Sequence, residues 1–569
     1  QAIGRRCLLI WLLCAVANAA DIQQFSPSLA EQALHYQAEL KIPGMPPIYN
    51  LRFHLHSYDY TSARASFGAM IYEDHDTNNA LSVEMRVGSP AFDNTNFGIF
   101  DTGYSRFSLP IELTDFAVNH AVWLATDRTY KSSVEQFIRK RAQHTYPDDH
   151  PGDYQLTGAK HITGEMPLPV EPQALLQTTR AISGHLAAPG NLEIGTVYLG
   201  IESGGETTVD TEGSVLFRPL EETSLQVVAH VRAVDGSLIT DTRIWTGKRP
   251  EHLPSEPEMT TEAVNMAFGL RMTALSETLE QEIIGPVILE GAAARDLFRY
   301  LLIPQLEGSP SPLPFDSSFG SLGGSPSTAS RLNRRILPTD FAVLDDPQRD
   351  TTHPSATSLD AEGTTVEMVS LVENGLVKSL LMSRIPRKGL SSTNGHARGY
   401  AGERLIGRAS QFIVSAEDAV RRKKLYKAGL KIARSYGNDF VIIVRQLQEP
   451  SVLALDSTYT GQFFGLDEQT TAQLPPPVAI YKRTKDGQEV RLRGAQFVRV
   501  HQSLLKQIAL TGPSSSGSFF ASTDPGVNTS QPLTGLATAV TAPDVLIPEM
   551  EIIPITANPR DIRTLRPSK

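Results

Sequence analysis

The chain has 569 residues, of which 40% are hydrophobic and 20% are charged. This is an ordinary globular composition, and the length allows two or more domains with cores of their own. The formal net charge of −10 excludes a general nucleic-acid-binding protein, because an acidic surface repels the phosphate backbone.

The segment 1–20 has the anatomy of a secretory signal peptide. A basic pair precedes an apolar segment, 7–17, and small residues that suit cleavage follow it. The alternative is a buried N-terminal helix. Both cysteines, Cys7 and Cys14, lie here, so the mature chain would have no disulfide, thiolate metal ligand or cysteine nucleophile. We expect an exported protein, periplasmic or extracellular. It would have no stable membrane anchor, because the apolar segment is too short to span a bilayer.

A helix and then a set of strands follow. We expect the helix over 26–40, with Ser26 as its cap and Pro27 in its first turn. The segment 48–58 alternates apolar residues with arginine and histidine. This period-two pattern predicts a half-buried strand, with an apolar inner face and a polar outer face.

Two long helices are expected further along, separated by more strands. The first covers 119–143 and is capped by Asn119. The second covers 260–284. After it, 285–302 is typical of a short apolar strand that turns directly into an amphipathic helix. The apolar stripe of the first long helix is Val122, Trp123, Thr126, Tyr130, Val134, Phe137 and Ile138.

Turns and strands dominate the second half. The glycine-, serine- and proline-rich segment 308–327 predicts a long loop, and 373–375 predicts a tight hairpin turn. A helix is expected over 415–437, with Ser415 as cap and Gly437 as C-terminal stop. The basic run at the start of this helix is interpreted as a solvated face and not as a binding patch.

The predicted fold class is α+β. An N-terminal α/β domain over 21–245 precedes a largely antiparallel, β-rich C-terminal domain over 246–545, and 546–569 form a tail. No internal repeat is evident.

Catalytic motifs are scarce. The sequence has no H-E-x-x-H helix, no G-x-S-x-G elbow and no Walker loop. His54 and His56 would point to one side of a strand and could share a metal ion, with 73–76 as a further contributor. The alternative is that they are two exposed sheet histidines, because no third ligand is evident.

A second polar cluster follows a basic segment in the C-terminal half. It combines Arg384 and Arg387 with Asn394, His396 and Arg398. A loop with so many hydrogen-bond donors could hold a peptide backbone or a carboxylate. The alternative is a turn whose donors are satisfied within the protein.

Six segments resemble the TldD/PmbA family of metallopeptidases and occur in the order of that family. The resemblance implies an N-terminal α/β domain, a C-terminal β domain and dimers that degrade peptides or unstructured segments. In its two-subunit systems, one subunit binds zinc through an H-E-x-x-x-H motif and a cysteine, and the PmbA- or TldE-like subunit carries none. The segments are 81–98, 122–140, 210–214, 285–298, 371–389 and 392–398.

The resemblance places the zinc motif on the predicted helix after residue 285. Its first histidine falls at Glu290, its glutamate at Gly291 and its second histidine at Arg295. A shifted register does not restore it, because no histidine lies between His252 and His353. The resemblance therefore implies no catalytic residue, metal ligand or cofactor in this chain, and zinc only in a paralogous partner.

Three hypotheses remain open. The chain is the non-metal subunit of a peptidase, paired with a zinc-bearing TldD-like paralogue or with itself, that acts on peptides or unfolded protein. Alternatively, it is a peptidase with a different site, at His54 and His56 or around His396. Thirdly, it is an exported peptide-binding protein that has lost catalysis and acts alone.

Overall fold

The computed structural model describes residues 21–98, 103–310, 312–313, 332–390, 392–400, 402–449, 474–521, 533 and 535–555. The predicted signal peptide and most of the predicted loop over 308–327 lie outside these ranges. Within them, no helix is both long and apolar enough to cross a membrane.

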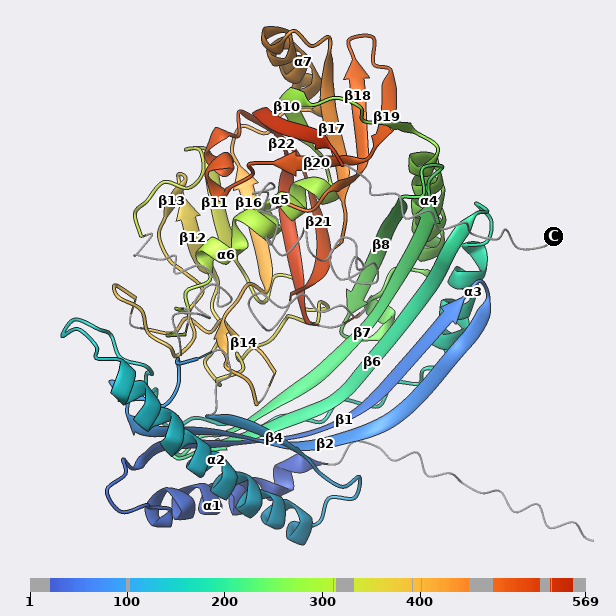
Figure 1. Cartoon of the computed structure of the whole chain (residues 1–569). Helices are drawn as coiled ribbons and strands as arrows, with labels where there is room; N and C mark the ends of the chain where they lie inside the picture. The colour runs from blue at the N-terminus through green and yellow to red at the C-terminus, as the bar shows by residue number, and fades with distance from the viewer. Residues whose placement is uncertain are drawn as a thin grey trace, which may run out of the picture.

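The N-terminal sheet has eight strands in the order β3-β2-β1-β6-β7-β5, with β4 beside β2 and β8 beside β7. Its pairings are antiparallel except for β5 with β7. Its long strands curve around the C-terminal half of the chain (Figure 1). The strands are β1 (Ile48–Ser66), β2 (Ala69–Ser89), β3 (Phe92–Asp93), β4 (Tyr104–Ser108), β5 (His161–Ile162), β6 (Leu192–Asp210), β7 (Val215–Arg232) and β8 (Leu238–Gly247).

Helices cover the convex side of this sheet (Figure 1). The apolar residues of β1, such as Leu51 and Phe53, are buried in a core shared with the first two helices. The concave side faces the C-terminal half, so the polar face of β1 is buried too: His54 is 2% exposed and His56 5%. The expected half-buried strand is therefore wrong on its polar face. The helices are α1 (Ser26–Glu39), α2 (Asp115–Gln143), α3 (Gln173–His185) and α4 (Glu256–Ala274), with 3-10 turns η1 (Ile22–Phe25) and η2 (Pro250–His252).

The predicted caps differ from those observed in the first two helices. The cap position of α1 is Phe25, one residue before Ser26, and has no side-chain cap. The hydroxyl of Thr114 caps α2 by accepting a hydrogen bond from a backbone N–H, so this helix starts before Asn119. In the predicted stripe of α2, Trp123 is 52% exposed and Ile138 38%, because they lie at the edge of the face that packs on the sheet.

The helix expected over 260–284 is shorter and starts earlier. Ser255 and Glu258 form a capping box at the start of α4, and the helix ends at Ala274. Its buried face packs in one core with α3 and the N-terminal strands. The expected domain boundary at 245 therefore separates a helix from the sheet that it covers.

The C-terminal sheet has twelve strands in the order β13-β12-β11-β16-β22-β10-β17-β18-β19-β9, with β20 and β21 also beside β22. It is largely antiparallel, with parallel pairing of β10 with β17, β16 with β22 and β19 with β9. The strands are β9 (Glu277–Thr278), β10 (Ile283–Leu289), β11 (Phe341–Asp345), β12 (Val369–Glu373), β13 (Leu376–Val377), β16 (Gln411–Ala416), β17 (Phe440–Leu447), β18 (Pro477–Thr484), β19 (Glu489–Arg493), β20 (Ala495–Val498), β21 (Leu510–Ala521) and β22 (Leu536–Pro554).

The mixture of helices and two separate sheets confirms the α+β class. The strand β22 continues to Pro554, so the expected tail from 546 begins inside the sheet, where its backbone is paired. The remaining elements are α5 (Ala292–Leu301), α6 (Ile303–Leu306), α7 (Arg422–Ala433), η3 (Arg434–Tyr436), η4 (Gln502–Gln507) and the small ladder of β14 (Ala397–Arg398) and β15 (Ile406–Gly407).

Local signals in the C-terminal half are mostly confirmed. Asn374 and Gly375 both have positive φ, 50° and 72°, as the predicted hairpin turn between β12 and β13 requires. Gly437 has φ 76° and ends the helical segment as expected. The helix α7 starts only at Arg422, because Ser415 belongs to β16 and pairs with β11.

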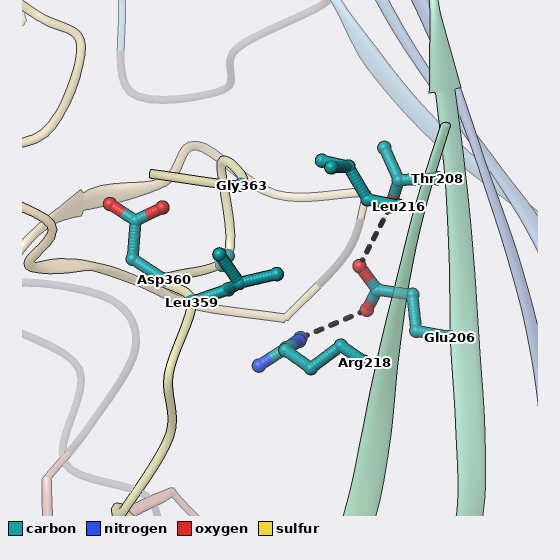
Figure 2. Close-up of a pocket in the computed structure, with 8 residues that line it drawn as sticks. Glu206, Thr208, Leu216, Arg218, Leu359, Asp360 and Gly363 are labelled. Carbon is teal, nitrogen blue, oxygen red and sulfur yellow. Dashed lines mark hydrogen bonds and ion pairs between the residues drawn. The ribbon is translucent and has the colours of Figure 1, made fainter. Parts of the chain in front are cut away.

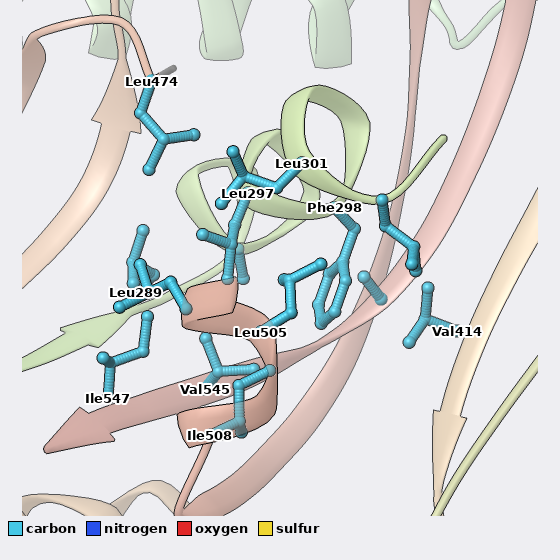
Figure 3. Close-up of a cluster of buried hydrophobic side chains, with 14 of the residues drawn as sticks. Leu289, Leu297, Phe298, Leu301, Val414, Leu474, Leu505, Ile508, Val545 and Ile547 are labelled. Carbon is cyan, nitrogen blue, oxygen red and sulfur yellow. The ribbon is translucent and has the colours of Figure 1, made fainter. Parts of the chain in front are cut away.

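The strand-to-helix element after residue 285 sits in the middle of this domain. The helix α5 buries Leu297, Phe298 and Leu301 against β22 and η4 (Figure 3). On the other face of the sheet, Ile288 of β10 packs with Leu425 of α7. The predicted strand and amphipathic helix are confirmed.

Candidate functional site

The positions at which the resemblance places the zinc motif lie at the start of α5. Glu290 directly follows β10 and is not helical, and Gly291 is the cap position of α5, with φ 55° and ψ −117°. Arg295 lies one turn inside the helix. This φ and ψ combination suits glycine and is strained for a residue with a side chain.

Glu290 faces away from Arg295, toward the side of the sheet that carries α7. It is 3% exposed, and its carboxylate accepts a hydrogen bond of 2.9 Å from Nε of Arg445. The same guanidinium donates to both carboxylate oxygens of Glu489, at 2.8 and 3.0 Å. Glu290 is thus bound in an ion-pair network at the position of the first histidine.

Arg295 faces the hairpin of β21 and β22. Its Nη1 donates to the hydroxyl of Ser515 at 2.8 Å. Between it and Glu290 lies Asp544, which is fully buried and accepts from the backbone N–H of Gly291 at 2.8 Å and from Nε of Arg422 at 2.6 Å. Its negative charge at the start of α5 complements the helix dipole.

The side chains at the start of α5 do not form a set of zinc ligands. Arginine cannot ligate a metal ion, and Asp544 is already engaged with two N–H donors. Across the described ranges, no group of three or more histidine, cysteine, aspartate and glutamate side chains is placed to hold a metal ion.

Introducing the residues of the H-E-x-x-x-H motif at these positions is not expected to create a metal site. In the variant Glu290→His, Gly291→Glu, Arg295→His, the glutamate would occupy a backbone conformation that favours glycine, and a third ligand would still be missing. We expect no tight stoichiometric zinc binding by calorimetry and metal analysis, as for the unmodified chain. One tightly bound zinc per chain would show that other side chains complete the site.

Next to this position, Asp296 is a carboxylate with a perturbed pKa. Burial raises its pKa to about 6, with Glu449 and Asp241 adding repulsion and Arg299 and Arg295 opposing the shift. Its side chain is 20% exposed and lies 3.7 Å from Nη1 of Arg299. A carboxyl whose pKa is raised by folding destabilises the native state as the pH rises above its unfolded pKa of about 4, and the full loss is reached above the folded pKa.

Asp296→Asn should therefore stabilise the protein under mildly basic conditions. We expect the free energy of unfolding at about pH 8 to rise by about 2 kcal/mol, since one pKa unit corresponds to about 1.4 kcal/mol. The gain should shrink between pH 6 and pH 4, where the native carboxyl is protonated. Urea unfolding at pH 8 and at pH 4 measures this gain in stability, and the exposed Asp418→Asn is the control. An equal gain at pH 8 and at pH 4 would contradict a raised pKa of Asp296.

The two histidines of β1 lie on the concave face of the N-terminal sheet. Nδ1 of His54 is 3.2 Å from Oε1 of Glu206 and 2.9 Å from Oγ1 of Thr208. Nδ1 of His56 is 3.5 Å from the other oxygen of Glu206, which also accepts from Arg218 at 2.9 Å. The expectation of two exposed histidines is wrong, because the C-terminal half covers this face.

These contacts leave little scope for catalysis at the histidines. Burial lowers the pKa of His56 to about 4, against the opposing charge of Glu206, so its ring is neutral at neutral pH. A cavity of about 10 Å³ lies between Glu206 and the loop that carries Asp360, with room for about one water (Figure 2). Glu206 is engaged by histidine, threonine and arginine donors and is not free to act as a general base.

A row of buried charges continues along the same face. Nη1 of Arg52 is 3.6 Å from Glu84, and Nη2 is 3.4 Å from Asp210, on the two neighbouring strands. Burial favours the neutral form of Glu84, but the guanidiniums of Arg86 and Arg52 outweigh it and lower the pKa of this carboxyl to about 2. These ion pairs connect β1 to β2 and β6, and the sequence did not predict them.

The predicted peptide-binding loop is tied into the protein. Arg384 is 1% exposed and pairs with Glu212 of the N-terminal half, and Arg387 donates to the carbonyl of Gly308. The side chain of Asn394 accepts from the N–H of Met382. These contacts fit the alternative to a peptide-binding loop, namely a turn whose hydrogen-bond donors are satisfied within the protein.

The other two members of this loop are buried as well. His396 is 1% exposed and lies 3.4 Å from the carboxylate of Asp345, which also accepts from the hydroxyl of Ser410. Arg398 donates to the backbone carbonyl of Ala537 at 2.7 Å. Peptide binding by these five residues stays a prediction.

Sequence reasoning missed Arg445, Asp544 and Glu206. Arg445 and Asp544 lie 155 and 253 residues from their partners at the start of α5, and Glu206 lies 152 residues from His54. No local spacing could have connected them. Only the alternation of apolar residues with arginine and histidine on β1 indicated a polar face.

The fold combines a curved, mainly antiparallel N-terminal sheet with a mixed C-terminal sheet that has a strand-to-helix element at its centre (Figure 1). Residues 283–443 match the family model of the PmbA/TldA metallopeptidase C-terminal domain. Three crystal structures share the fold over nearly the whole chain. The matched C-terminal domain and the shared fold confirm the resemblance to the PmbA/TldD family seen in the sequence.

The first of these structures is a proposed modulator of DNA gyrase from Thermotoga maritima, with 14% identity, a TM-score of 0.56 and coverage of 88% of this chain and 96% of that one. TldE from Thermococcus kodakarensis has 12% identity, a TM-score of 0.53 and coverage of 92% and 99%. A proposed DNA gyrase modulator from Bacteroides thetaiotaomicron has 11% identity, a TM-score of 0.54 and coverage of 93% and 99%. No curated protein sequence matches the chain.

Proposed function

We propose that this protein is an exported, non-metal subunit of a PmbA/TldD-type peptidase. It would pair with a zinc-bearing paralogue and help to hold peptides or unfolded polypeptides for cleavage by that partner. The zinc would belong to the partner, and this chain would carry no cofactor.

The observation that supports this proposal is a well-packed strand-to-helix scaffold without zinc ligands at the positions where the resemblance places the motif. The strand β10 and the helix α5 are well packed, with Leu297 and Phe298 fully buried. The positions for ligands hold Glu290, which is paired with Arg445, and Arg295, which cannot bind a metal. A scaffold without ligands favours a role in support of catalysis elsewhere.

Export rests on the sequence of residues 1–20 and on the cysteine-free remainder of the chain. A zinc-bearing partner would then need its own export signal. The substrates of such a pair would be peptides outside the cytoplasm.

Co-expression tests the proposal. The full chain is produced together with a paralogue that carries H-E-x-x-x-H, and the complex is isolated through a tag on one subunit. We expect a stable complex and faster cleavage of unfolded casein than by the paralogue alone. The matched control is the paralogue with its motif glutamate replaced by glutamine, which should assemble without cleaving.

Two outcomes would contradict the proposal. Failure to form a complex, together with an unchanged peptidase rate of the paralogue, removes the role as partner subunit. Chelator-insensitive cleavage of casein by this chain alone would instead support a peptidase with a different site.

A further inference from the structure

The guanidinium of Arg295 lies flat on the backbone of β21. A Cβ atom added to Gly517 would stand 2.7 Å from its Nε and 2.8 Å from both Cζ and Nη2. These similar distances place the plane of the guanidinium against the glycine. Together with the hydrogen bond from Nη1 to Ser515, the glycine gives Arg295 one defined position.

No ion pair joins Arg295 to a carboxylate in the parts of the chain that the structure describes. Asp296, its neighbour in sequence, leans toward Arg299, because adjacent helical residues point in different directions. Asp544 is engaged by Arg422 and by the first amide of α5. Nε and Nη2 of Arg295 therefore have no protein acceptor among these carboxylates.

The environment does not favour an unpaired cation. Burial lowers the pKa of Arg295, and the positive charge of Arg243 on β8 lowers it further, while Asp296 and Asp544 oppose the shift. Arg243 uses Nη1 for Asp241, at 3.1 Å, and its side chain is 32% exposed. The strand β8, which carries Arg243, contacts β21, the strand of Ser515 and Gly517.

We propose that Arg295 binds a carboxylate group of a peptide ligand. The planar fork of a guanidinium donates two parallel hydrogen bonds to the two oxygens of a carboxylate, and such charge-assisted pairs are strong when partly buried. The arginine at the position of the second zinc histidine would then hold substrate instead of metal. The inference rests on the proposed function for the peptide nature of the ligand.

A carboxylate can come from the C-terminus of a peptide or from an acidic side chain. Three labelled, unstructured peptides of one sequence separate these sources: a free C-terminal acid, its C-terminal amide, and the amide with one internal glutamate. Fluorescence anisotropy measures their binding to the full chain alone. No partner subunit is present, so the result is independent of the co-expression experiment.

We expect at least one carboxylate-bearing peptide to bind about tenfold more tightly than the plain amide, as for a lost hydrogen bond to a charged group. Arg295→Ala should abolish the difference. Gly517→Ala should reduce it although the arginine remains, because the added Cβ displaces the guanidinium. Ser515→Ala is a milder second variant, and the exposed Arg334→Ala is the matched control.

Equal affinity for all three peptides would overturn the proposal, as would the absence of binding at millimolar peptide. A preference for carboxylates that survives Arg295→Ala would place the site elsewhere. Circular dichroism of each variant separates lost binding from lost folding.

Discussion

Arg52→Met is expected to lower the free energy of unfolding by about 3–5 kcal/mol, because it removes one partner from a buried ion-pair network. Arg52 is 0% exposed and lies between Glu84 and Asp210 on the neighbouring strands. Methionine is shorter than arginine but flexible and close to it in volume, so the change leaves no large cavity. The loss would come from carboxylates that stay buried with fewer positive neighbours. Urea unfolding at neutral pH measures it.

The pH dependence gives this prediction a second readout. The pKa of Glu84 is lowered to about 2, so the ionised carboxylate stabilises the native state above its unfolded pKa of about 4, and this contribution is lost as the pH falls toward 2. The deficit of Arg52→Met should therefore shrink in acid.

Two further variants control for side-chain loss. The double variant Arg52→Met, Glu84→Gln should recover part of the stability, because it removes one buried charge. Exposed Arg334→Met should change stability by no more than about 0.5 kcal/mol. A deficit of Arg52→Met as small as that of the exposed control would show that water screens the network.

Phe298→Ala should cost about 3–5 kcal/mol, the usual range for truncation of a buried phenylalanine. Phe298 is 0% exposed and fills the space between α5 and β11, where its ring centroid is 6.4 Å from that of Phe341. Alanine would leave a cavity in the largest core of the C-terminal domain (Figure 3). Thermal and urea unfolding of the full chain measure the loss.

The control for this prediction is a phenylalanine on the surface. Phe116 of α2 is 80% exposed, so Phe116→Ala should change stability by no more than about 0.5 kcal/mol. Phe298→Leu should lose less than the alanine variant, because leucine refills most of the cavity. A similar small effect of Phe298→Ala and Phe116→Ala would mean that α5 is not fixed by its core.

Local sequence patterns were sufficient for many elements of the fold. The amphipathic spacing of Leu297, Phe298 and Leu301 predicted the buried face of α5, and 373–375 predicted the hairpin turn. Such signals are local because helix periodicity and turn conformation depend on residues a few positions apart. Helix boundaries were less accurate: α4 ends at Ala274, because its C-terminal neighbours pair as strands instead.

The candidate site at the start of α5 was also predictable from sequence only in part. The sequence shows that Glu290, Gly291 and Arg295 do not spell the zinc motif that the resemblance places there. What these residues do instead is not visible, because Arg445 and Ser515 come from strands far along the chain.

The α+β class, the resemblance to the PmbA/TldD family and the absence of an H-E-x-x-x-H motif follow from the order and identity of residues alone. The burial of the polar face of β1 does not follow from sequence, because a period-two pattern is the same whether the polar face contacts solvent or another domain. His54 and His56 therefore looked exposed, and only the packing of the C-terminal half against the concave sheet buries them. Charge pairing follows the same rule, since the partner of Arg52 or Glu290 is decided by which strands lie side by side.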